Sequence, residues 1–277
     1  SEKLEEIIPE SEIIFVATPS KIINDVLDRL TNFSMDNKMI ISCTKGINEN
    51  PFMTMSEAIE KHFNNSSIKV GVLSGPNLAK EIADEKVAGT VIASKHADLC
   101  HQSREILSSS TFKIYTSDDI KGIELAGALK NIYAIISGYC HSLDVGENAI
   151  GLILTRSMAE MSNFAVNKGA NPITFLGLAG MGDLVATCFS KLSRNYQFGW
   201  AIGEGLDIEA AKYKVGQVAE GLNTIRIIHN EISSSKIRMP LVSGMHEILF
   251  NSGSKELLLE QIINSDIYVD VNFDVES

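Results

Sequence analysis

The sequence predicts an α/β fold, in which a parallel sheet is followed by a helical domain. Short apolar, β-branched runs such as EIIFVA and MIISC alternate with helix-length amphipathic segments over residues 1–117, and this alternation is typical of βαβ units. From residue 118 on, segments with helical periodicity follow one another and strand-like runs are almost absent. We therefore expect two domains, 1–117 and 118–277, as the length of 277 residues also favours.

The individual segments agree with this division. Residues 13–17, IIFVA, are apolar without alternation, as expected of a strand covered on both faces. The second domain is expected to contain helices at about 120–140, 147–168, 218–232 and 241–250. The last dozen residues, DIYVDVNFDVES, alternate only weakly, and either a strand or a tail is compatible with them.

Composition excludes several classes of function. A net charge of −11 argues against a nucleic-acid partner or an anionic membrane surface. No apolar run approaches the roughly 20 residues that span a bilayer, and the acidic N-terminus does not read as an export signal, so no stable membrane insertion is expected. The four scattered cysteines form no C-x-x-C pair, which indicates free thiols in a reducing, cytoplasmic setting.

No metal site is expected from the sequence. His96 and Cys100 are four residues apart on a predicted helix, which is the spacing of half a metal site. No second pair of ligands accompanies them, so a solvated helix face is the favoured interpretation.

Lys130 is the most unusual residue of the second domain. It lies in ELAGALKNIYAI, a helix whose other residues predict burial, and an ammonium group buried without a partner costs several kcal/mol or loses its proton. Its helical neighbours include Ala126, Gly127 and Ala134, a strip of small residues that could leave room for a ligand. The alternative is a lysine that reaches the helix surface.

Turns after three predicted strands could bind an anion. ATPS, CTKG and LSGPN follow the strands directly. Loops at the carboxyl ends of parallel strands line the ligand crevice, so Lys45 and the Gly75 backbone are well placed to bind an anionic ligand. Further on, Ser193, Arg194 and Asn195 put a hydroxyl, a guanidinium and an amide side by side, a group suited to phosphate oxygens. The alternative is an ordinary helix N-terminus, where the same polar residues would occur without binding a ligand.

A glycine loop for a dinucleotide is missing. No G-x-G-x-x-G occurs in residues 1–120, although such a loop normally follows the first strand of a dinucleotide-binding sheet. Either the fold binds something else or its first part is absent. The second interpretation is favoured, because the chain already begins in a predicted helix just before a strand.

Taken together, the order and spacing of these motifs indicate a specific protein family. The series ATPS, CTKG, LSGPNLAKE, ELAGALKNIYAI, GLAGMGDLVATC, LSRNYQFG and VAEGLNT resembles bacterial NAD(P)-dependent glycerol-3-phosphate dehydrogenase over almost the whole chain except the last dozen residues. The resemblance implies a Rossmann-type parallel sheet, N-terminally incomplete by about 60 residues or two βα units, which binds NAD or NADP. It also implies an all-α substrate-binding domain and a homodimer.

The resemblance also assigns roles to residues. Lys130 matches the catalytic base. The substrate-binding positions are Lys45, Gly75, Asn77, Lys130, Asp183, Ser193, Arg194 and Asn195, and the cofactor-binding positions are Lys45, Ala79, Arg194, Val218 and Glu220. Asn77 departs from the family, which usually has serine or threonine at this position.

The implied reaction interconverts sn-glycerol 3-phosphate and dihydroxyacetone phosphate by hydride transfer, and it would supply glycerol 3-phosphate for phospholipid synthesis. The substrate is then a small-molecule phosphate. Two alternatives stay open: a related two-domain hydroxy-acid dehydrogenase, which would not need the Ser-Arg-Asn group, and a cofactor-free binding protein derived from such an enzyme.

Overall fold

The computed structural model describes residues 3–64, 66–216, 219–254 and 256–263. The chain divides into two compact units, the first comprising residues 1–131 and 165–187 and the second residues 132–164 and 188–277. The expected domain boundary, between residues 117 and 118, falls just before helix α6 (Ile120–Ser142). The compact units instead divide α6 between them. The weakly alternating C-terminal segment, residues 266–277, lies outside the described residues.

A five-stranded sheet forms the centre of the first unit, and its strand order follows the sequence. β1 pairs with β2, β2 with β3 and β4 with β5 in parallel. The predicted α/β class is confirmed, but β4 runs antiparallel to β3. The connection between these two strands contains only the short helix α4 (Ala79–Ala83), whereas the parallel β4–β5 pair is joined through the longer α5 (Ala97–Leu107), as a parallel crossover requires. The strands are β1 (Ile13–Val16), β2 (Met39–Ser42), β3 (Lys69–Ser74), β4 (Ala88–Ser94) and β5 (Phe112–Ser117).

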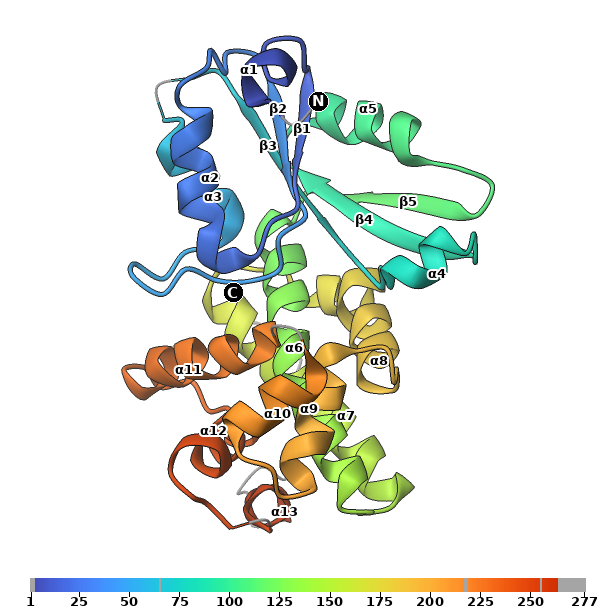
Figure 1. The fold of residues 1–277 in the computed structure, drawn as a ribbon, viewed down its shortest axis with the longest axis vertical. Coiled ribbons are helices and arrows are strands. Elements are labelled where there is room, and N and C mark those ends of the chain that lie inside the picture. Colours follow the sequence, from blue (N-terminus) through green and yellow to red (C-terminus); the bar gives the residue numbers. More distant parts are fainter. Residues whose placement is uncertain (1–2, 65, 217–218, 255, 264–277) are drawn as a thin grey trace. The chain divides into compact units, whose positions relative to one another are not determined.

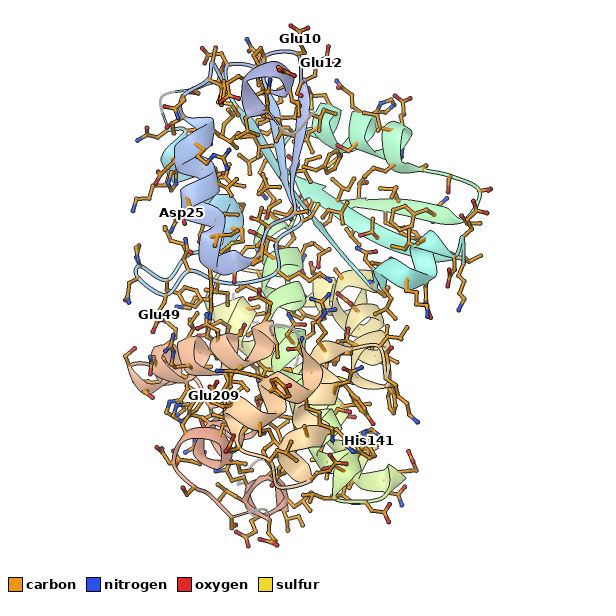
Figure 2. The ribbon with its side chains drawn as sticks, in the orientation of Figure 1. Glu10, Glu12, Asp25, Glu49, His141 and Glu209 are labelled. Carbon is orange, nitrogen blue, oxygen red and sulfur yellow. The ribbon has the colours of Figure 1, made fainter. Side chains whose placement is uncertain are left out.

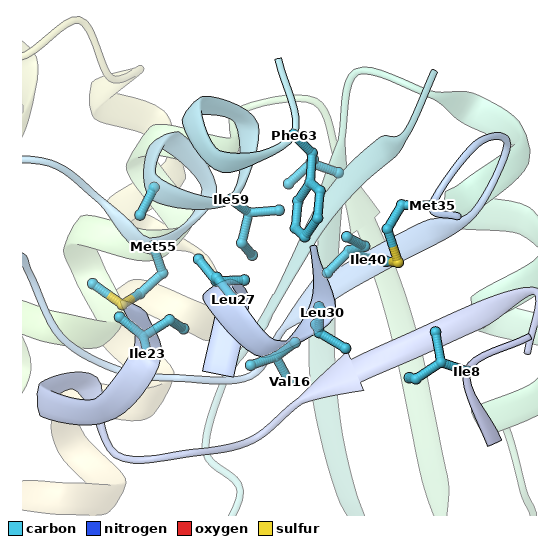
Figure 3. Close-up of a cluster of buried hydrophobic side chains, with 12 residues drawn as sticks. Ile8, Val16, Ile23, Leu27, Leu30, Met35, Ile40, Met55, Ile59 and Phe63 are labelled. Atoms are coloured by element: carbon cyan, nitrogen blue, oxygen red, sulfur yellow. The ribbon is translucent and has the colours of Figure 1, made fainter. Parts of the chain in front are cut away.

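Helices cover both faces of this sheet (Figure 1). On one face, Ile23 and Leu27 of α2 and Ile59 of α3 pack on Val16 and Ile40 of the sheet, as Figure 3 shows. On the other face, Leu99 of α5 packs in a separate cluster with sheet residues. The strand β2 is buried at all four positions, which is why its sequence shows no alternation. The helices and turns of this unit are α1 (Leu4–Ile7), η1 (Ser20–Ile22), α2 (Ile23–Leu30), α3 (Met55–His62), α4 (Ala79–Ala83), α5 (Ala97–Leu107), η2 (Pro172–Leu176), η3 (Leu178–Gly182) and α8 (Asp183–Cys188).

The first half of α6 is anchored to the sheet. Ile123 packs with Val72 of β3 and Val91 of β4 in a third buried cluster. One turn later the helix comes very close to the end of β3: a Cβ atom added at Gly127 would lie 2.4 Å from Ser74 Oγ. The small residue at this position therefore serves close packing of protein on protein.

The second unit is helical in its described part. Its helices besides the end of α6 are α7 (Glu147–Asn167), α9 (Arg194–Gly203), α10 (Ile208–Val215), α11 (Glu220–Ser233), α12 (Pro240–Phe250) and α13 (Leu257–Ile263). Glycines let α9 and α6 meet backbone to backbone. A Cβ atom at Gly199 would lie 1.8 Å from the carbonyl oxygen of Ile135, and one at Gly138 would lie 2.0 Å from that of Tyr196.

Much of the negative charge lies at the surface of each unit. Glu10, Glu12 and Asp25 of the first unit and Glu209 of the second are exposed, as the side-chain view in Figure 2 illustrates. Among the described helices, none combines the length and the apolar character that a bilayer crossing would demand.

Candidate active site

Lys130 is buried and hydrogen-bonded within the protein. Its side chain, on α6, is only 7% exposed. The Nζ atom donates hydrogen bonds to Oδ1 of Asp183 and, at 2.7 Å, to Oγ1 of Thr187. Thr187 lies one helical turn after Asp183 on α8, and its hydroxyl is 3.2 Å from the same carboxylate oxygen. The surface-lysine interpretation of Lys130 is therefore wrong.

A second lysine approaches the same carboxylate from the sheet. Lys45, in the loop after β2, donates hydrogen bonds from Nζ to Asp183 Oδ2 at 2.7 Å and to the carbonyl oxygen of Gly75 at 3.0 Å. Gly75 follows β3, so the loops after two neighbouring parallel strands converge here, as expected for the carboxyl ends of such strands. Lys45, Gly75, Lys130 and Asp183, which are far apart in the sequence, thus meet within the first unit.

The electrostatics of this cluster favour proton exchange near neutral pH. Burial lowers the pKa of Lys130 from 10.5 to about 7, and the positive charge of Lys45 acts in the same direction, while Asp183 opposes both. Because two ammonium groups share a single carboxylate, the cluster carries a net positive charge whenever Lys130 is protonated. It can attract an anion in spite of the negative charge of the whole chain.

Polar atoms without partners lie around the same strand ends. Among the described residues, the buried side-chain atoms Thr18 Oγ1, Ser42 Oγ, Ser74 Oγ and Asn77 Oδ1 have no hydrogen-bond partner. Unpaired buried polar atoms are costly, so a ligand with its own donors and acceptors would stabilise them. The carboxamide of a nicotinamide ring has both, and these residues therefore fit the NAD or NADP that the resemblance implies.

Asn77 has a defined orientation. Its Nδ2 donates to Thr90 Oγ1 at 2.9 Å, and the Thr90 hydroxyl in turn donates to the Ser74 carbonyl oxygen at 3.1 Å. One N–H of the amide is therefore used within the protein, and Oδ1 is left to accept a hydrogen bond. Ala79, the other predicted position nearby, begins the short helix α4.

The remaining predicted positions lie in the second unit. Ser193 is the N-cap of α9 and accepts a hydrogen bond from the backbone of Tyr196, while Arg194 is exposed at the first helical position. Asn195 Oδ1 accepts from the backbone nitrogen of Gly221 at 3.0 Å, and so holds the start of α11, which begins at Glu220. Val218 lies outside the described residues.

Thr187 is a site residue that the sequence-based prediction missed. A signal was present, since a hydroxyl four residues after Asp183 on a helix lies on the same face. The spacing could have suggested that any partner of the aspartate would also meet the threonine.

Fold and site together define a class of protein. A Rossmann-type sheet with polar strand ends, joined to a helical unit and provided with a buried lysine of lowered pKa, is the arrangement of a two-domain dehydrogenase. Profile matches make the class more specific: the "NAD-dependent glycerol-3-phosphate dehydrogenase N-terminus" matches residues 1–100, and the corresponding "C-terminus" matches residues 119–260. The chain belongs to this family.

Individual relatives agree with this assignment. The glycerol-3-phosphate dehydrogenase [NAD(P)+] of Pseudomonas syringae pv. tomato is 46% identical over 263 residues, which cover 95% of this chain and 76% of that protein. The enzyme of the same name from Alcanivorax borkumensis is 44% identical over 99% of this chain and 79% of its own length. The crystal structure of glycerol-3-phosphate dehydrogenase from Coxiella burnetii superposes with a TM-score of 0.90 at 31% identity, covering 95% of this chain and 80% of that one. The family resemblance read from the sequence is confirmed.

More distant structures share the fold alone. A ternary structure of D-mandelate dehydrogenase with NADH matches with a TM-score of 0.51 and 14% identity, over 91% of this chain and 76% of that one. The hydroxy-acid dehydrogenase alternative therefore has the support of general architecture only.

Proposed function

We propose that the protein catalyses the NAD(P)-dependent interconversion of sn-glycerol 3-phosphate and dihydroxyacetone phosphate. The observation that carries the proposal is the buried Lys130 ammonium, which is bonded to Asp183 and has its pKa lowered to about 7 by burial and by Lys45. Family membership and the high identity to enzymes of this name support it as well. NAD(P), when bound, accepts or donates the hydride.

Lys130 acts as the general base and acid. In its neutral form it takes the proton of the substrate's secondary hydroxyl during oxidation, and in its protonated form it returns a proton to the oxygen during reduction. A pKa near the working pH suits both directions. Asp183 and Thr187 hold the Nζ atom in place through their hydrogen bonds, and Lys45 keeps the pKa low, so these three residues position and tune the base.

Recognition of the phosphate is assigned to the segment around Arg194. Arg194 is exposed, and it stands at the start of α9, where the helix dipole favours an anion. A guanidinium forms paired hydrogen bonds to phosphate oxygens. Asn195 is engaged with Gly221, so its share in substrate binding is expected to be the positioning of its neighbours.

Substrate selectivity tests this proposal against the alternatives. The full-length protein would be assayed with NADH and with NADPH on dihydroxyacetone phosphate, on unphosphorylated dihydroxyacetone and on a short 2-keto acid. We expect turnover of the phosphate, with a kcat/KM at least about a hundredfold above that of the other two compounds, since a site built for a charged group rejects an analogue that lacks it. Preferred turnover of the keto acid would favour the hydroxy-acid dehydrogenase, and no cofactor binding would favour the binding protein.

The wider role follows from the same reaction. Its product, glycerol 3-phosphate, is the phosphorylated backbone of phospholipids, and we assign the enzyme to their synthesis in the cytoplasm. The homodimer implied by the family resemblance stays a prediction, which analytical ultracentrifugation of the full-length protein would check.

A further inference from the structure

We propose that His229, His246 and Glu247 form a binding site for a divalent transition-metal ion, with Zn²⁺ as the best match. Each residue offers one ligand atom, and the three atoms lie within 4.8 Å of one another. His229 is on α11, and His246 and Glu247 are successive residues on α12, so a bound ion would connect two helices that pack together within the second unit.

The two histidines are already in contact. Their rings stack with centroids 3.7 Å apart and an angle of 5° between their planes, and Phe250 lies on His246 with a centroid distance of 4.9 Å. Ligand atoms about 2.1 Å from a tetrahedral zinc ion lie roughly 3.4 Å apart, so the three atoms must close in by at most about 1.4 Å. The nitrogen lone pairs of stacked rings lie in two parallel planes, and a single ion cannot lie in both planes, so one ring must turn. The phenyl ring of Phe250 packs against His246, so His229 is the ring that turns.

One nitrogen of these two histidines lacks a hydrogen-bond partner in the described part of the chain. His246 Nδ1 is buried and forms no hydrogen bond among the described residues. The nearest carboxylate oxygen, Oε1 of Glu247, is 3.8 Å away, which is too far for a hydrogen bond. An unsatisfied buried nitrogen costs free energy, and a cation placed beside it would satisfy this nitrogen. The Glu247 carboxylate already accepts hydrogen bonds from Asn251 Nδ2 at 3.0 and 3.1 Å, and its remaining lone pairs can bind the ion.

The ligand types also suit a transition metal. Burial and the neighbouring His229 lower the pKa of His246, which favours neutral imidazole, the form that coordinates metal ions. Two imidazole nitrogens and one carboxylate oxygen form a ligand set typical of zinc, whereas Mg²⁺ and Ca²⁺ prefer oxygen ligands. Water would complete the coordination.

Direct binding of Zn²⁺ tests the site. The full-length protein, without a histidine tag and freed of metal by a chelator, would be titrated with ZnCl₂ by calorimetry and then heated with and without the ion. We expect one equivalent to bind, and a zinc concentration about ten times the dissociation constant to raise Tm by roughly 2 to 5 °C. Absence of saturable binding, or an equal response to MgCl₂, would overturn the proposal.

Variants locate the site. His229→Gln and His246→Gln should each lose the zinc-dependent rise in Tm while folding cooperatively without metal. His101→Gln is the matched control, because His101 is exposed and pairs at 3.5 Å with Glu105 on α5, outside the proposed site. If either site variant unfolds, Glu247→Gln takes its place, with the same expected loss. Retention of the full zinc response by folded site variants would contradict the proposal.

Cobalt separates this site from the cysteines. Co²⁺ bound by His229, His246 and Glu247 should give visible d–d absorption without a thiolate-to-cobalt charge-transfer band in the near ultraviolet. A strong charge-transfer band would assign the ion to one of the four free cysteines instead, and would refute the proposed site.

Discussion

Lys45 and Lys130 donate hydrogen bonds to opposite oxygens of one carboxylate, that of Asp183. One carboxylate is thus the shared ion-pair partner of two ammonium groups, in a cluster that is largely shielded from water. The charge of Lys45 disfavours the protonated form of Lys130, and the deep burial of Lys130 acts in the same direction, so Lys130 can release its proton near neutral pH.

Loss of Lys130 should remove proton transfer and little else. We expect Lys130→Met to lower kcat by about a hundredfold or more and to leave the dissociation constant of NADH nearly unchanged, because general acid–base catalysis is typically worth this much. Steady-state kinetics and fluorescence titration would measure the two quantities. Lys121→Met is the control, since Lys121 lies on the same helix but is 38% exposed and pairs with Glu57. A Lys130 variant with near-normal kcat would exclude the base role.

The pH dependence should follow the charges around Lys130. Oxidation needs the neutral amine, so kcat/KM for glycerol 3-phosphate should rise with pH through about 7, the pKa of Lys130. Lys45→Met removes a positive charge that lowers this pKa, and should move the rise to higher pH. Asp183→Asn removes the charge that raises it, and should move the rise to lower pH, with a smaller kcat because the amine is less well held. Shifts in one common direction would rule out this electrostatic coupling.

Arg194 should matter for the phosphate group only. We expect Arg194→Ala to weaken binding of dihydroxyacetone phosphate about 10- to 150-fold, which corresponds to the roughly 1.5 to 3 kcal/mol of a hydrogen bond to a charged group. Binding of unphosphorylated dihydroxyacetone should not change. Lys191→Ala, an exposed cation in the same segment, is the comparison. If the variant distinguishes the two ketones as well as the wild type does, another residue binds the phosphate.

A buried carboxyl group in the second unit should make stability depend on pH. Glu160 accepts hydrogen bonds from the backbone of Leu241 at 2.7 Å and from the Tyr133 hydroxyl at 3.0 Å, and burial raises its pKa from 4.5 to about 8. The folded state therefore binds more protons than the unfolded state between about pH 4.5 and 8, and this contribution to the free energy of unfolding is lost as the pH rises through that range.

Two substitutions of Glu160 separate shape from charge. Glu160→Gln can keep both hydrogen bonds, because the tyrosine hydroxyl can also accept, and it should flatten the pH dependence of urea unfolding between pH 4.5 and 8. Glu160→Ala leaves two buried polar groups unpaired and should cost about 2 to 5 kcal/mol. Identical pH profiles for the wild type and the glutamine variant would show that this carboxyl group does not titrate in that range.

Glu124 and Glu160 share the sequence feature that singled out Lys130. Each is a charged residue in an otherwise apolar helical segment, a pattern that predicts a buried group with a specific role, and Glu124 stands in the same segment as Lys130. Both are buried with raised pKa values, and Glu124 accepts a hydrogen bond from the backbone nitrogen of Ser56 at 2.9 Å, near the start of α3. The local pattern carried this information.

Other features could not be predicted from the local sequence. Periodicity fixes neither the direction of a strand nor its partner, so the reversal of β4 was not predictable from its apolar residues. The strip of small residues beside Lys130 suggested room for a ligand, whereas at Gly127 the space is taken by Ser74. The meeting of Lys45 with Asp183, and the stacking of His229 on His246, depend on how distant segments pack.

The backbone contacts between α6 and α9 restrict which residues these helices can carry at the points of contact. At Gly138 and Gly199, no rotamer change can make room for a methyl group, since the obstructing atoms are carbonyl oxygens of the partner helix. The spacing of the two helices is thus set by main-chain atoms. The distance of α9, which begins at Arg194, from α6 should therefore stay the same when the side chains beside these glycines are exchanged. In a library of variants these two glycines would admit no substitute, whereas Gly151 on α7, with open space around it, would tolerate many.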